Sequence, residues 1–202
     1  MSAFVVRPRP HAPLRSDGDL LAAIADGDLG ALGEIYDRFA SDVWRVARRI
    51  LVSDADAEDV VHAVFMKLPQ IAASHDGRSN VRAWLLGICV HVASRHRRSA
   101  ARFFNMIASF ARVASTATRT DPEQLVSARQ ELRIFEATLA KLSPKKRIAF
   151  MLVELEGLTS DEAARALGVP AATVRTRLHH ARAELDLALK FRGNDTNGGS
   201  HG

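Results

Sequence analysis

Apolar residues recur at alternating intervals of three and four in the N-terminal part of the chain. The clearest run consists of Leu29, Leu32, Tyr36, Phe39, Val43, Val46 and Ile50. This spacing places the side chains along one stripe of an α-helix, because the helix turns once every 3.6 residues. Asp26-Gly27-Asp28 offers a turn and a cap before this helix, and a shorter helix is expected at 20–25.

Two more helices are expected in the N-terminal half. The first follows a cap region at 53–56, and Pro69 should end or kink it. Its apolar stripe is Ala57, Val60, Val61, Val64, Phe65 and Leu68. Residues 75–80 have the composition of a loop. The second helix follows this loop, with the stripe Val81, Trp84, Leu85, Ile88 and Val92. The stripe position of Trp84 favours core packing over insertion into DNA.

The second half of the chain predicts a separate group of helices. Its first stripe is Leu125, Ala128, Leu132, Phe135, Leu139 and Leu142. Ser143-Pro144 fits an N-cap followed by proline at the first helical position, and Gly157 fits the C-cap of that helix. The apolar side chains of this helix are Ile148, Met151, Leu152 and Leu155. Residues 99–124 are expected to form the linker, with a short amphipathic helix at 103–110 and a polar, Thr-rich part at 115–122.

A helix-turn-helix pattern lies near the end of the chain. Thr159 and Glu162 have the spacing of a capping box, in which each side chain bonds the backbone N–H of the other residue. Gly168 should stop this short helix, and Val169-Pro170 completes a tight turn. A longer helix is expected to run from Ala171 to about residue 189.

The longer helix has two chemically different faces. Its apolar face carries Val174, Leu178 and Ala181. Its opposite face carries Thr176, His179 and His180, with Arg175 and Arg182 on one shoulder and Arg177 on the other. A helix that enters the DNA major groove needs donors for base edges and cations for phosphates, so this pattern favours DNA binding. The alternative is a basic amphipathic helix on the surface of a helical bundle.

The predicted fold class is all-α, because no segment alternates apolar and polar residues with a period of two. We expect two small helical domains joined by a flexible linker, the second containing the helix-turn-helix. The expected boundaries are 17–98 for the first domain and 125–190 for the second. Residues 1–16 and 191–202 are expected to be disordered tails.

The net charge of +5 and a sequence pI of about 10.0 indicate an anionic partner, either nucleic acid or a membrane surface. The excess is clustered at Arg95, Arg97, Arg98 and Arg102, for which a solvated helix end is the alternative. The single cysteine, Cys89, excludes an internal disulfide and a zinc site of three or four cysteines. The sequence shows neither an apolar signal segment nor a run of about eighteen apolar residues. We therefore expect a cytoplasmic protein.

With these motifs in view, residues 17–189 resemble the extracytoplasmic-function (ECF) class of bacterial RNA polymerase sigma factors. DADAEDVVHAVFMKL and NVRAWLLGICVHVASRHRR resemble region two of that family, which binds the polymerase clamp and opens the −10 promoter element. LSPKKRIAFMLVELEGLTSDEAARALGVPAATVRTRLHHARAEL resembles region four, which reads the −35 element. The resemblance is specific because both regions occur in this order. It implies a factor that binds core RNA polymerase and directs promoter-specific transcription initiation.

The resemblance implies three groups of site residues. Contacts to the polymerase clamp are expected at Asp56, Glu58, Asp59, His62 and Met66. Contacts to the −10 element are expected at His75, Asp76, Arg78, Ser79, Asn80, His91, Arg95 and Arg98. Contacts to the −35 element are expected at Thr173, Arg175, Thr176, Arg177, His179, His180 and Arg182. An acidic, partly apolar surface suits the basic clamp, and a flipped base needs a pocket that offsets the cost of unstacking.

Several positions depart from the family pattern, so contacts there are expected to differ. A glutamine–acid pair is usual at His62-Ala63, asparagine at His91, aspartate at Ser94 and arginine at His180. The linker is also more apolar than the acidic connector usual in the family. The resemblance further implies an anti-sigma protein as a partner, beside core polymerase and promoter DNA.

Two other classes of function remain open. A stand-alone helix-turn-helix repressor or activator would need neither the acidic surface near Asp59 nor a separate N-terminal domain. An enzyme would need a catalytic set, but His91 and His96 are five residues apart and do not share a helix face. The sequence contains no Gly-rich phosphate loop and no nucleophile elbow. We expect no catalytic residue, no metal and no cofactor.

Overall fold

The computed structural model of the protein describes residues 15–51, 53–77, 80–110 and 137–195, with the backbone alone described at 100–110 and 189–195. Within these ranges every regular element is helical, which confirms the predicted all-α class. The N-terminal elements are α1 (Asp17–Ala25), α2 (Leu29–Ile50), α3 (Asp54–Ile71), the 3-10 turn η1 (Ala72–Ser74) and α4 (Val81–Phe110). The C-terminal elements are α6 (Pro144–Phe150), the π-helical turn η2 (Met151–Leu155), α7 (Ser160–Leu167) and α8 (Ala171–Asp195). Residues 137–141 are helical as well.

Short polar side chains fix where several helices begin. Asp28 accepts hydrogen bonds from two backbone N–H groups in the first turn of α2. Thr159 and Glu162 form the capping box that the sequence predicts for α7. Ser16 and Asp19 form the same reciprocal motif at the start of α1, which the sequence analysis did not predict. These caps satisfy backbone donors that a helix start otherwise leaves unpaired.

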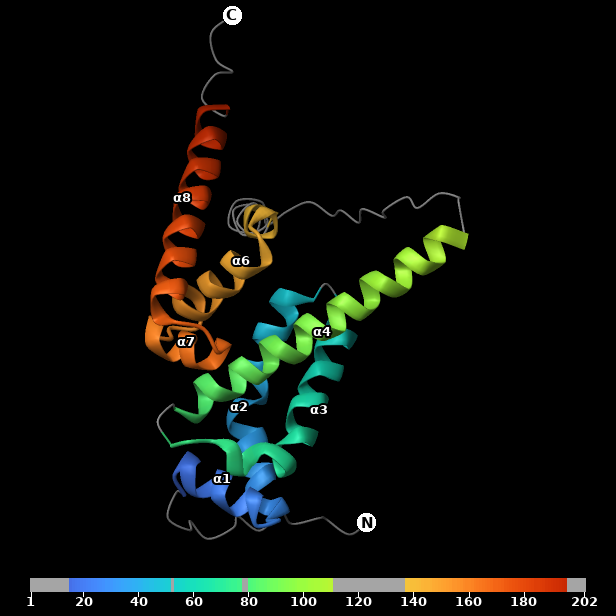
Figure 1. Ribbon diagram of the computed structural model, residues 1–202, viewed down its shortest axis with the longest axis vertical. Coiled ribbons are helices and arrows are strands. Elements are labelled where there is room, and N and C mark those ends of the chain that lie inside the picture. Colours follow the sequence, from blue (N-terminus) through green and yellow to red (C-terminus); the bar gives the residue numbers. More distant parts are fainter. Residues whose placement is uncertain (1–14, 52, 78–79, 111–136, 196–202) are drawn as a thin grey trace, which may run out of the picture.

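The N-terminal domain is a small helical bundle. Helices α2, α3 and α4 all pack against one another, and α1 packs on α2, α3 and η1 (Figure 1). Its largest fully buried side chains include Leu20, Ile24, Ile35, Leu68, Leu85 and Leu86. Burying each such side chain contributes about 1.5–3 kcal/mol, so this core holds the bundle together.

The buried face of α2 differs from the prediction in its first half. The prediction places Leu29 and Tyr36 in the core, but they are 75% and 38% exposed. Ala31 and Ile35 are fully buried instead. The spacing fits both faces, because residues 31 and 35 also lie about one helical turn apart. The second half of the predicted stripe is confirmed, with Val43, Val46 and Ile50 buried.

Three backbone details also differ from the prediction. Helix α3 continues past Pro69 to Ile71 and then tightens into η1. Helix α4 continues through the basic cluster to Phe110, so the helix expected at 103–110 is an extension of α4. The helix after Ser143 ends in a π-helical turn, in which the backbone N–H of Glu156 donates to the carbonyl of Met151 at 3.0 Å.

The predicted helix-turn-helix is formed by α7 and α8. Gly168 ends α7 with a φ of +63°, a left-handed conformation that glycine adopts without a steric cost. Helix α8 packs on α6 and α7. The side chains buried between α8 and the preceding segment are Leu139, Leu142, Phe150, Leu178, Ala181 and Leu185. The inner face that the sequence predicts for the longer helix is therefore confirmed.

The two domains contact each other directly. Helix α7 lies against the N-terminal half of α4 (Figure 1). One apolar cluster extends from α1–α4 into the C-terminal domain, where it includes Met151, Leu152, Leu158, Ala163 and Val174. This contact determines which candidate functional surfaces face solvent and which face the other domain.

Candidate functional site

Most residues expected to contact polymerase lie on the solvent side of α3. The exposed members are Glu58, Asp59, His62 and Met66. Met66 is 73% exposed, which is unusual for a large apolar side chain. Asp56 is half-buried, and its Oδ1 lies 3.2 Å from Nε2 of His96 on α4. The structure thus gathers four of the five residues on one exposed face, while Asp56 turns toward α4.

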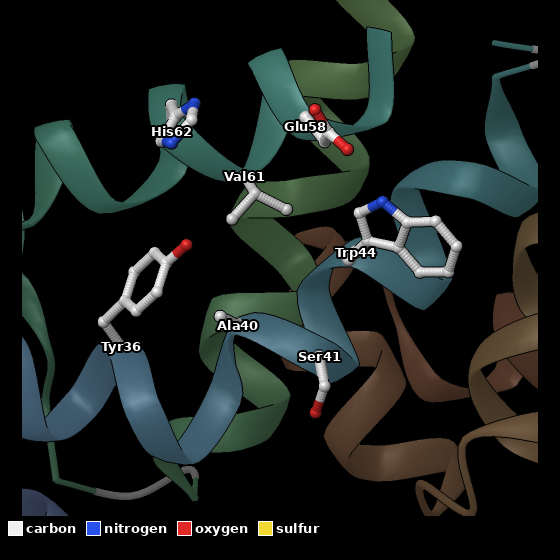
Figure 2. A pocket seen from close by; sticks show the side chains of 7 residues that line it. All are labelled: Tyr36, Ala40, Ser41, Trp44, Glu58, Val61 and His62. Carbon is white, nitrogen blue, oxygen red and sulfur yellow. The ribbon is translucent and has the colours of Figure 1, made fainter. Parts of the chain in front are cut away.

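A groove of about 360 Å³ lies beside this face, between α2 and α3. Figure 2 shows Tyr36 and Trp44 extending from α2 on either side of Val61 on α3. Each aromatic side chain is 38% exposed. The other lining residues are Ala40, Ser41, Glu58 and His62. The groove therefore combines an apolar floor with an acidic and a histidine side chain at its edge.

This groove was not predicted from the sequence, in which Tyr36 is expected in the core and Trp44 has no assigned role. A signal was nevertheless present, because Tyr36, Ala40 and Trp44 are spaced by four and share one helix face. Exposed aromatic side chains with an apolar body and a polar tip are enriched at protein interfaces. The groove and the acidic face of α3 therefore form one candidate docking surface.

The loop expected to contact the −10 element is described in part, because Arg78 and Ser79 lie outside the described residues. The His75 ring packs edge-on against Trp84, with ring centroids 5.2 Å apart. Trp84 is half-buried against the core cluster, as its stripe position predicts. Gly77 has a φ of +70°, and its backbone N–H donates to Nδ1 of His75 at 3.3 Å. Asp76 lies between these two residues.

A cavity of about 630 Å³ separates this loop from α1. On the loop side it is lined by His75, Gly77, Asn80 and Val81, and next to them by Ala72 and Ala73. On the other side it is lined by Asp17, Gly18, Leu21, Ala22, Ala25 and Asp26. Pockets of about 300–1,000 Å³ hold small ligands, so a single base fits this volume. The α1 wall was not predicted from the sequence, because α1 carries no recognisable motif.

Asn80 makes two contacts at the start of α4. Its Oδ1 accepts a hydrogen bond from the backbone N–H of Ala83 at 2.7 Å and so caps the helix. Its Nδ2 donates to Oε1 of Glu162, in the C-terminal domain, at 3.0 Å. A residue expected to contact the −10 element is therefore engaged by the other domain in this conformation.

The remaining −10 candidates, His91, Arg95 and Arg98, lie exposed along α4. His91 and Arg98 line a cleft of about 330 Å³ between α4 and the C-terminal domain. The facing residues are Lys145, Ile148, Leu167, Val169 and Arg177. Nδ1 of His91 is 2.8 Å from the carbonyl oxygen of Gly87. The cleft thus brings cations from both domains together.

Arg147 lies near this cleft in an unfavourable setting. Burial lowers the pKa of its guanidinium, and the positive charge of Arg97 lowers that pKa further. Its Nε is buried and has no hydrogen-bond partner among the described residues. Contact between the domains therefore carries an electrostatic cost on this side.

The predicted −35 residues divide into an exposed and a half-buried set. The exposed residues are Arg175, Thr176, His179, His180 and Arg182. Thr173 and Arg177 are half-buried, and Arg177 lines the interdomain cleft. Behind them, Val174 and Ala181 are fully buried. Helix α8 therefore presents the polar and basic outer face that the sequence predicts, except at its cleft side.

Two of these arginines have carboxylate neighbours within the same domain. Nε of Arg182 donates to Oε1 of Glu154 at 3.1 Å. A nitrogen of Arg175 lies 4.0 Å from Oδ1 of Asp161. Both arginine side chains are more than half exposed, so these ion pairs are screened and weak. Both arginines can therefore leave these partners at little cost.

A buried carboxylate, Glu156, joins the two domains. Its side chain is fully buried, and all three of its arginine partners belong to the N-terminal domain: Arg45, Arg49 and Arg82. Nη2 of Arg82 donates to its Oε2 at 2.7 Å, and Arg45 donates to both carboxylate oxygens. The hydrogen bonds that Arg45 donates to Glu156 raise the pKa of Arg45. Asp42 completes this Glu156 cluster by accepting hydrogen bonds from Arg45 and Arg82.

The Glu156 cluster was not predicted from the sequence, because its arginine partners lie far from Glu156 in the chain, two of them on α2 and one on α4. Gly87 of α4 also approaches the C-terminal domain closely. A Cβ added at Gly87 would lie 2.3 Å from the carbonyl oxygen of Ala166 in α7. Glycine is therefore needed here for the two helices to meet.

Other kinds of site find no support among the described residues. No group of three or more His, Cys, Asp or Glu side chains there is arranged to hold a metal ion. His91 and His96 have separate partners on Gly87 and Asp56. Burial raises the pKa of Cys89 to about 12, so its thiol is not a nucleophile at neutral pH. None of the described helices is both long and apolar enough to cross a membrane.

Comparison with known families matches both halves of the chain. Residues 35–103 match sigma-70 region 2, and residues 132–185 match sigma-70 region 4. The ECF RNA polymerase sigma factor SigL of Mycobacterium tuberculosis is 30% identical over 173 residues, covering 84% of this chain and 95% of SigL. The RNA polymerase sigma factor CnrH of Cupriavidus metallidurans is 30% identical over 183 residues, covering 88% of this chain and 96% of CnrH.

Solved structures agree with this assignment. CnrH in complex with the cytosolic domain of CnrY has a TM-score of 0.64 and 25% identity, covering 87% of this chain and 98% of CnrH. The sigma factor RpoE of Bartonella quintana, in complex with the anti-sigma factor NepR, has a TM-score of 0.63 and 25% identity. That match covers 78% of this chain and 96% of RpoE. With both sigma regions in order and relatives matched almost end to end, the chain belongs to the ECF family of RNA polymerase sigma factors, which direct promoter-specific transcription initiation.

Proposed function

We propose that the N-terminal domain docks on core RNA polymerase through α3 and the groove beside it. Glu58, Asp59 and His62 supply an exposed polar and acidic face, and Met66 adds an apolar side chain. Trp44 and Tyr36 extend this surface into the groove (Figure 2). An acidic rim around exposed aromatic side chains suits a basic, amphipathic helix of the partner. Asp56 contributes at the edge of this surface, where it faces His96.

We propose that an unpaired base of the −10 element binds in the cavity between α1 and the loop. His75 and Asn80 offer polar groups at its wall, with Asp76 beside them, and Arg78 and Ser79 are proposed to act with them. The volume of about 630 Å³ suits one base. His91, Arg95 and Arg98 on α4 are proposed to follow the DNA backbone electrostatically.

We propose that α8 reads the −35 element in the major groove. The observation that carries this proposal is the exposed outer face of Thr176, His179 and His180, directly opposite the fully buried Val174 and Ala181. Thr173, Arg175 and Arg177 lie nearer the start of the helix, where base contacts are concentrated, and Arg182 lies farther along.

We further propose that none of this chain's residues is catalytic, since polymerase forms the phosphodiester bonds, and that the protein acts in the cytoplasm. CnrH was solved in complex with the cytosolic domain of CnrY, and RpoE of Bartonella quintana in complex with the anti-sigma factor NepR. By this similarity we propose that the present chain is also held by an anti-sigma protein.

The central experiment measures assembly with core RNA polymerase and transcription from genomic fragments. Asp59→Arg reverses a charge on the exposed face of α3 and should abolish co-elution with core polymerase. Asp186→Arg, on the exposed face of α8, is the matched control and should co-elute normally. If Asp59→Arg binds core as the wild type does, the docking assignment is wrong. If the wild type itself neither binds core nor initiates transcription, a stand-alone DNA-binding regulator becomes the better interpretation.

A further inference from the structure

The cleft between α4 and the C-terminal domain gathers positive charge without a matching carboxylate. Arg98 lines it from α4, Lys145 from α6 and Arg177 from α8. Among the residues that the structure describes, no Asp or Glu lines this cleft. None of the three cations has an ion pair in the described part of the chain, whereas the adjacent Lys146 pairs with Glu184. The two walls of the cleft therefore face each other with like charges.

Two more cations raise the positive charge beside the cleft. Arg147 lies on α6 between Lys145 and Ile148, which both line the cleft. Burial and the positive charge of Arg97 both lower the pKa of the Arg147 guanidinium. Its Nε is buried and has no hydrogen-bond partner among the described residues. An anion in the cleft would offset the repulsion among these charges.

The cleft has the size and lining of a site for a small ligand. Its volume of about 330 Å³ lies in the range of about 300–1,000 Å³ that is typical of ligand pockets. His91, Ser94 and Arg98 are spaced by three and four residues, so they share one face of α4. The volume equals roughly eleven water molecules at about 30 Å³ each, so a DNA duplex does not fit inside.

Phosphate is the anion that these side chains suit best. A guanidinium such as that of Arg98 or Arg177 can donate to two phosphate oxygens at once, and the ammonium of Lys145 adds a compact charge. Ser94 is half-buried in the same wall and offers a hydroxyl donor. Because the cations come from three helices around the cleft, an anion with several linked phosphate groups matches them better than a single carboxylate does.

We propose that the cleft lined by Arg98, Lys145 and Arg177 binds a small anion with linked phosphate groups. The three cations donate to phosphate oxygens, and Ser94 adds a hydrogen bond from its hydroxyl. The site is separate from the Glu156 cluster and from the cavity beside the −10 loop. The inference concerns the chain alone, so it does not rest on the proposed contacts with polymerase or promoter DNA. A ligand that binds only the folded chain also stabilises it by mass action.

Calorimetric titration of the full chain with inorganic pyrophosphate, in magnesium-free buffer, tests the site. We expect one saturable site per chain and weaker binding of sulfate at equal ionic strength. Arg98→Gln and Lys145→Gln should each lower the affinity for pyrophosphate about tenfold, because each removes a charge-assisted hydrogen bond. Arg95→Gln and Lys141→Gln are the matched controls and should bind as the wild type does. Each removes an exposed cation a few residues away that does not line the cleft.

Ser94→Asp tests the charge balance of the cleft. The new carboxylate lies one helical turn before Arg98 and among the cleft cations, so the variant should unfold at a higher urea concentration than the wild type. It should also bind pyrophosphate at least tenfold more weakly, because it repels the anion and engages the same cations. Pyrophosphate should therefore raise the melting temperature of the wild type and leave that of Ser94→Asp unchanged.

A promoter duplex separates a site for a small polyphosphate from attraction to the phosphates of DNA. Lys145 belongs to neither the −10 group nor the −35 group of candidate residues. Lys145→Gln should therefore bind the duplex as the wild type does while it loses affinity for pyrophosphate.

Three results would overturn the proposal. In the first, pyrophosphate binds no more strongly than sulfate does at equal ionic strength. In the second, Arg95→Gln and Lys141→Gln lose as much affinity as the cleft variants, so the attraction is spread over the basic surface. In the third, Lys145→Gln keeps its affinity for pyrophosphate and loses affinity for the duplex, so this lysine serves DNA.

Discussion

Arg82 bonds both the side chain and the backbone of Glu156, through Nη2 to Oε2 at 2.7 Å and through Nη1 to the carbonyl oxygen at 2.8 Å. Its third nitrogen, Nε, donates a hydrogen bond to Asp42. One guanidinium therefore ties α4 to α2 and to the segment just before the helix-turn-helix. Such a planar, multiply bonded group cannot be replaced by lysine without loss, because an ammonium lacks the fork of fixed donors.

Arg82→Met should destabilise the folded protein by about 2 kcal/mol. Breaking one partner of a buried ion pair costs about 3–5 kcal/mol, and two arginines remain on Glu156 to offset part of this. Urea denaturation followed by circular dichroism measures the loss. Arg48→Met is the control, since Arg48 pairs with the exposed Asp54 and should cost less than about 1 kcal/mol. Equal losses for the two variants would contradict a stabilising role of the Glu156 cluster.

Stability should fall in acid, in part through Asp42. Burial raises the pKa of Asp42, but hydrogen bonds from Arg82 and Arg45 outweigh it and hold the pKa below its ordinary value of 3.8. A carboxyl group with a depressed folded pKa contributes stability above its unfolded pKa and loses it as pH falls through the folded value. The urea midpoint should therefore drop as pH is lowered past 3.8.

Asp42→Asn isolates this contribution. The variant should be less stable than the wild type near neutral pH, and its urea midpoint should change less steeply in acid. The variant should keep some pH dependence, because hydrogen bonds donated by the backbone N–H and the hydroxyl of Thr159 lower the pKa of Glu162 as well. An unchanged slope in Asp42→Asn would show that Asp42 does not titrate with unfolding.

Local patterns in the sequence predicted most of the fold but not the contact between its domains. The capping box at Thr159 and the left-handed Gly168 were predictable, since both depend on neighbours within a few residues. The partners of Glu156 were not, because an Arg in α2 and a Glu before α7 share no local pattern. The exposed position of Tyr36 could not be predicted from the sequence either. Its three–four spacing is helical, but only the packing of neighbouring helices decides which of two faces is buried.

The parts of the candidate site that depend on a local sequence motif were predicted. The parts that depend on packing between separate helices were not. The outer face of α8 follows from helical periodicity and is exposed as expected. The cavity by the −10 loop needs a wall from α1, and α1 has no motif that links it to a loop about fifty residues later. The aromatic groove likewise forms only where α2 meets α3.

Trp44→Ala should weaken binding to core polymerase about tenfold or more without unfolding the protein. Trp44 lines the groove and is 38% exposed, and buried aromatic side chains contribute strongly at protein interfaces. Leu187→Ala is the control, because Leu187 is an exposed apolar residue on α8, 57% exposed and outside the groove. Co-elution and fluorescence titration measure the effect. Equal binding by Trp44→Ala and the wild type would remove the groove from the docking surface.

The last prediction separates base reading from phosphate contact on α8. Arg175 lies near the helix start, is 60% exposed at its side chain and has a weak neighbour in Asp161. A guanidinium there can pair bidentately with guanine, so Arg175→Ala should cost about 1–3 kcal/mol and relax preference at one or two positions. Arg182 lies two helical turns later and pairs with Glu154. Arg182→Ala should weaken all duplexes alike and reduce the salt slope of binding by about one.

The measurement uses holoenzyme assembled from core polymerase and the full chain, titrated with promoter and scrambled −35 duplexes at several salt concentrations. The holoenzyme is used because it is the form proposed to read the −35 element, whereas in the structure of the chain alone Arg177 is half-buried at the cleft between the domains. Arg175→Ala should lose affinity for the promoter sequence and little for the scrambled one. If it loses both equally, Arg175 contacts phosphate and not bases. If neither variant changes binding, the outer face of α8 does not touch the −35 element, and its exposed histidines and arginines serve another partner.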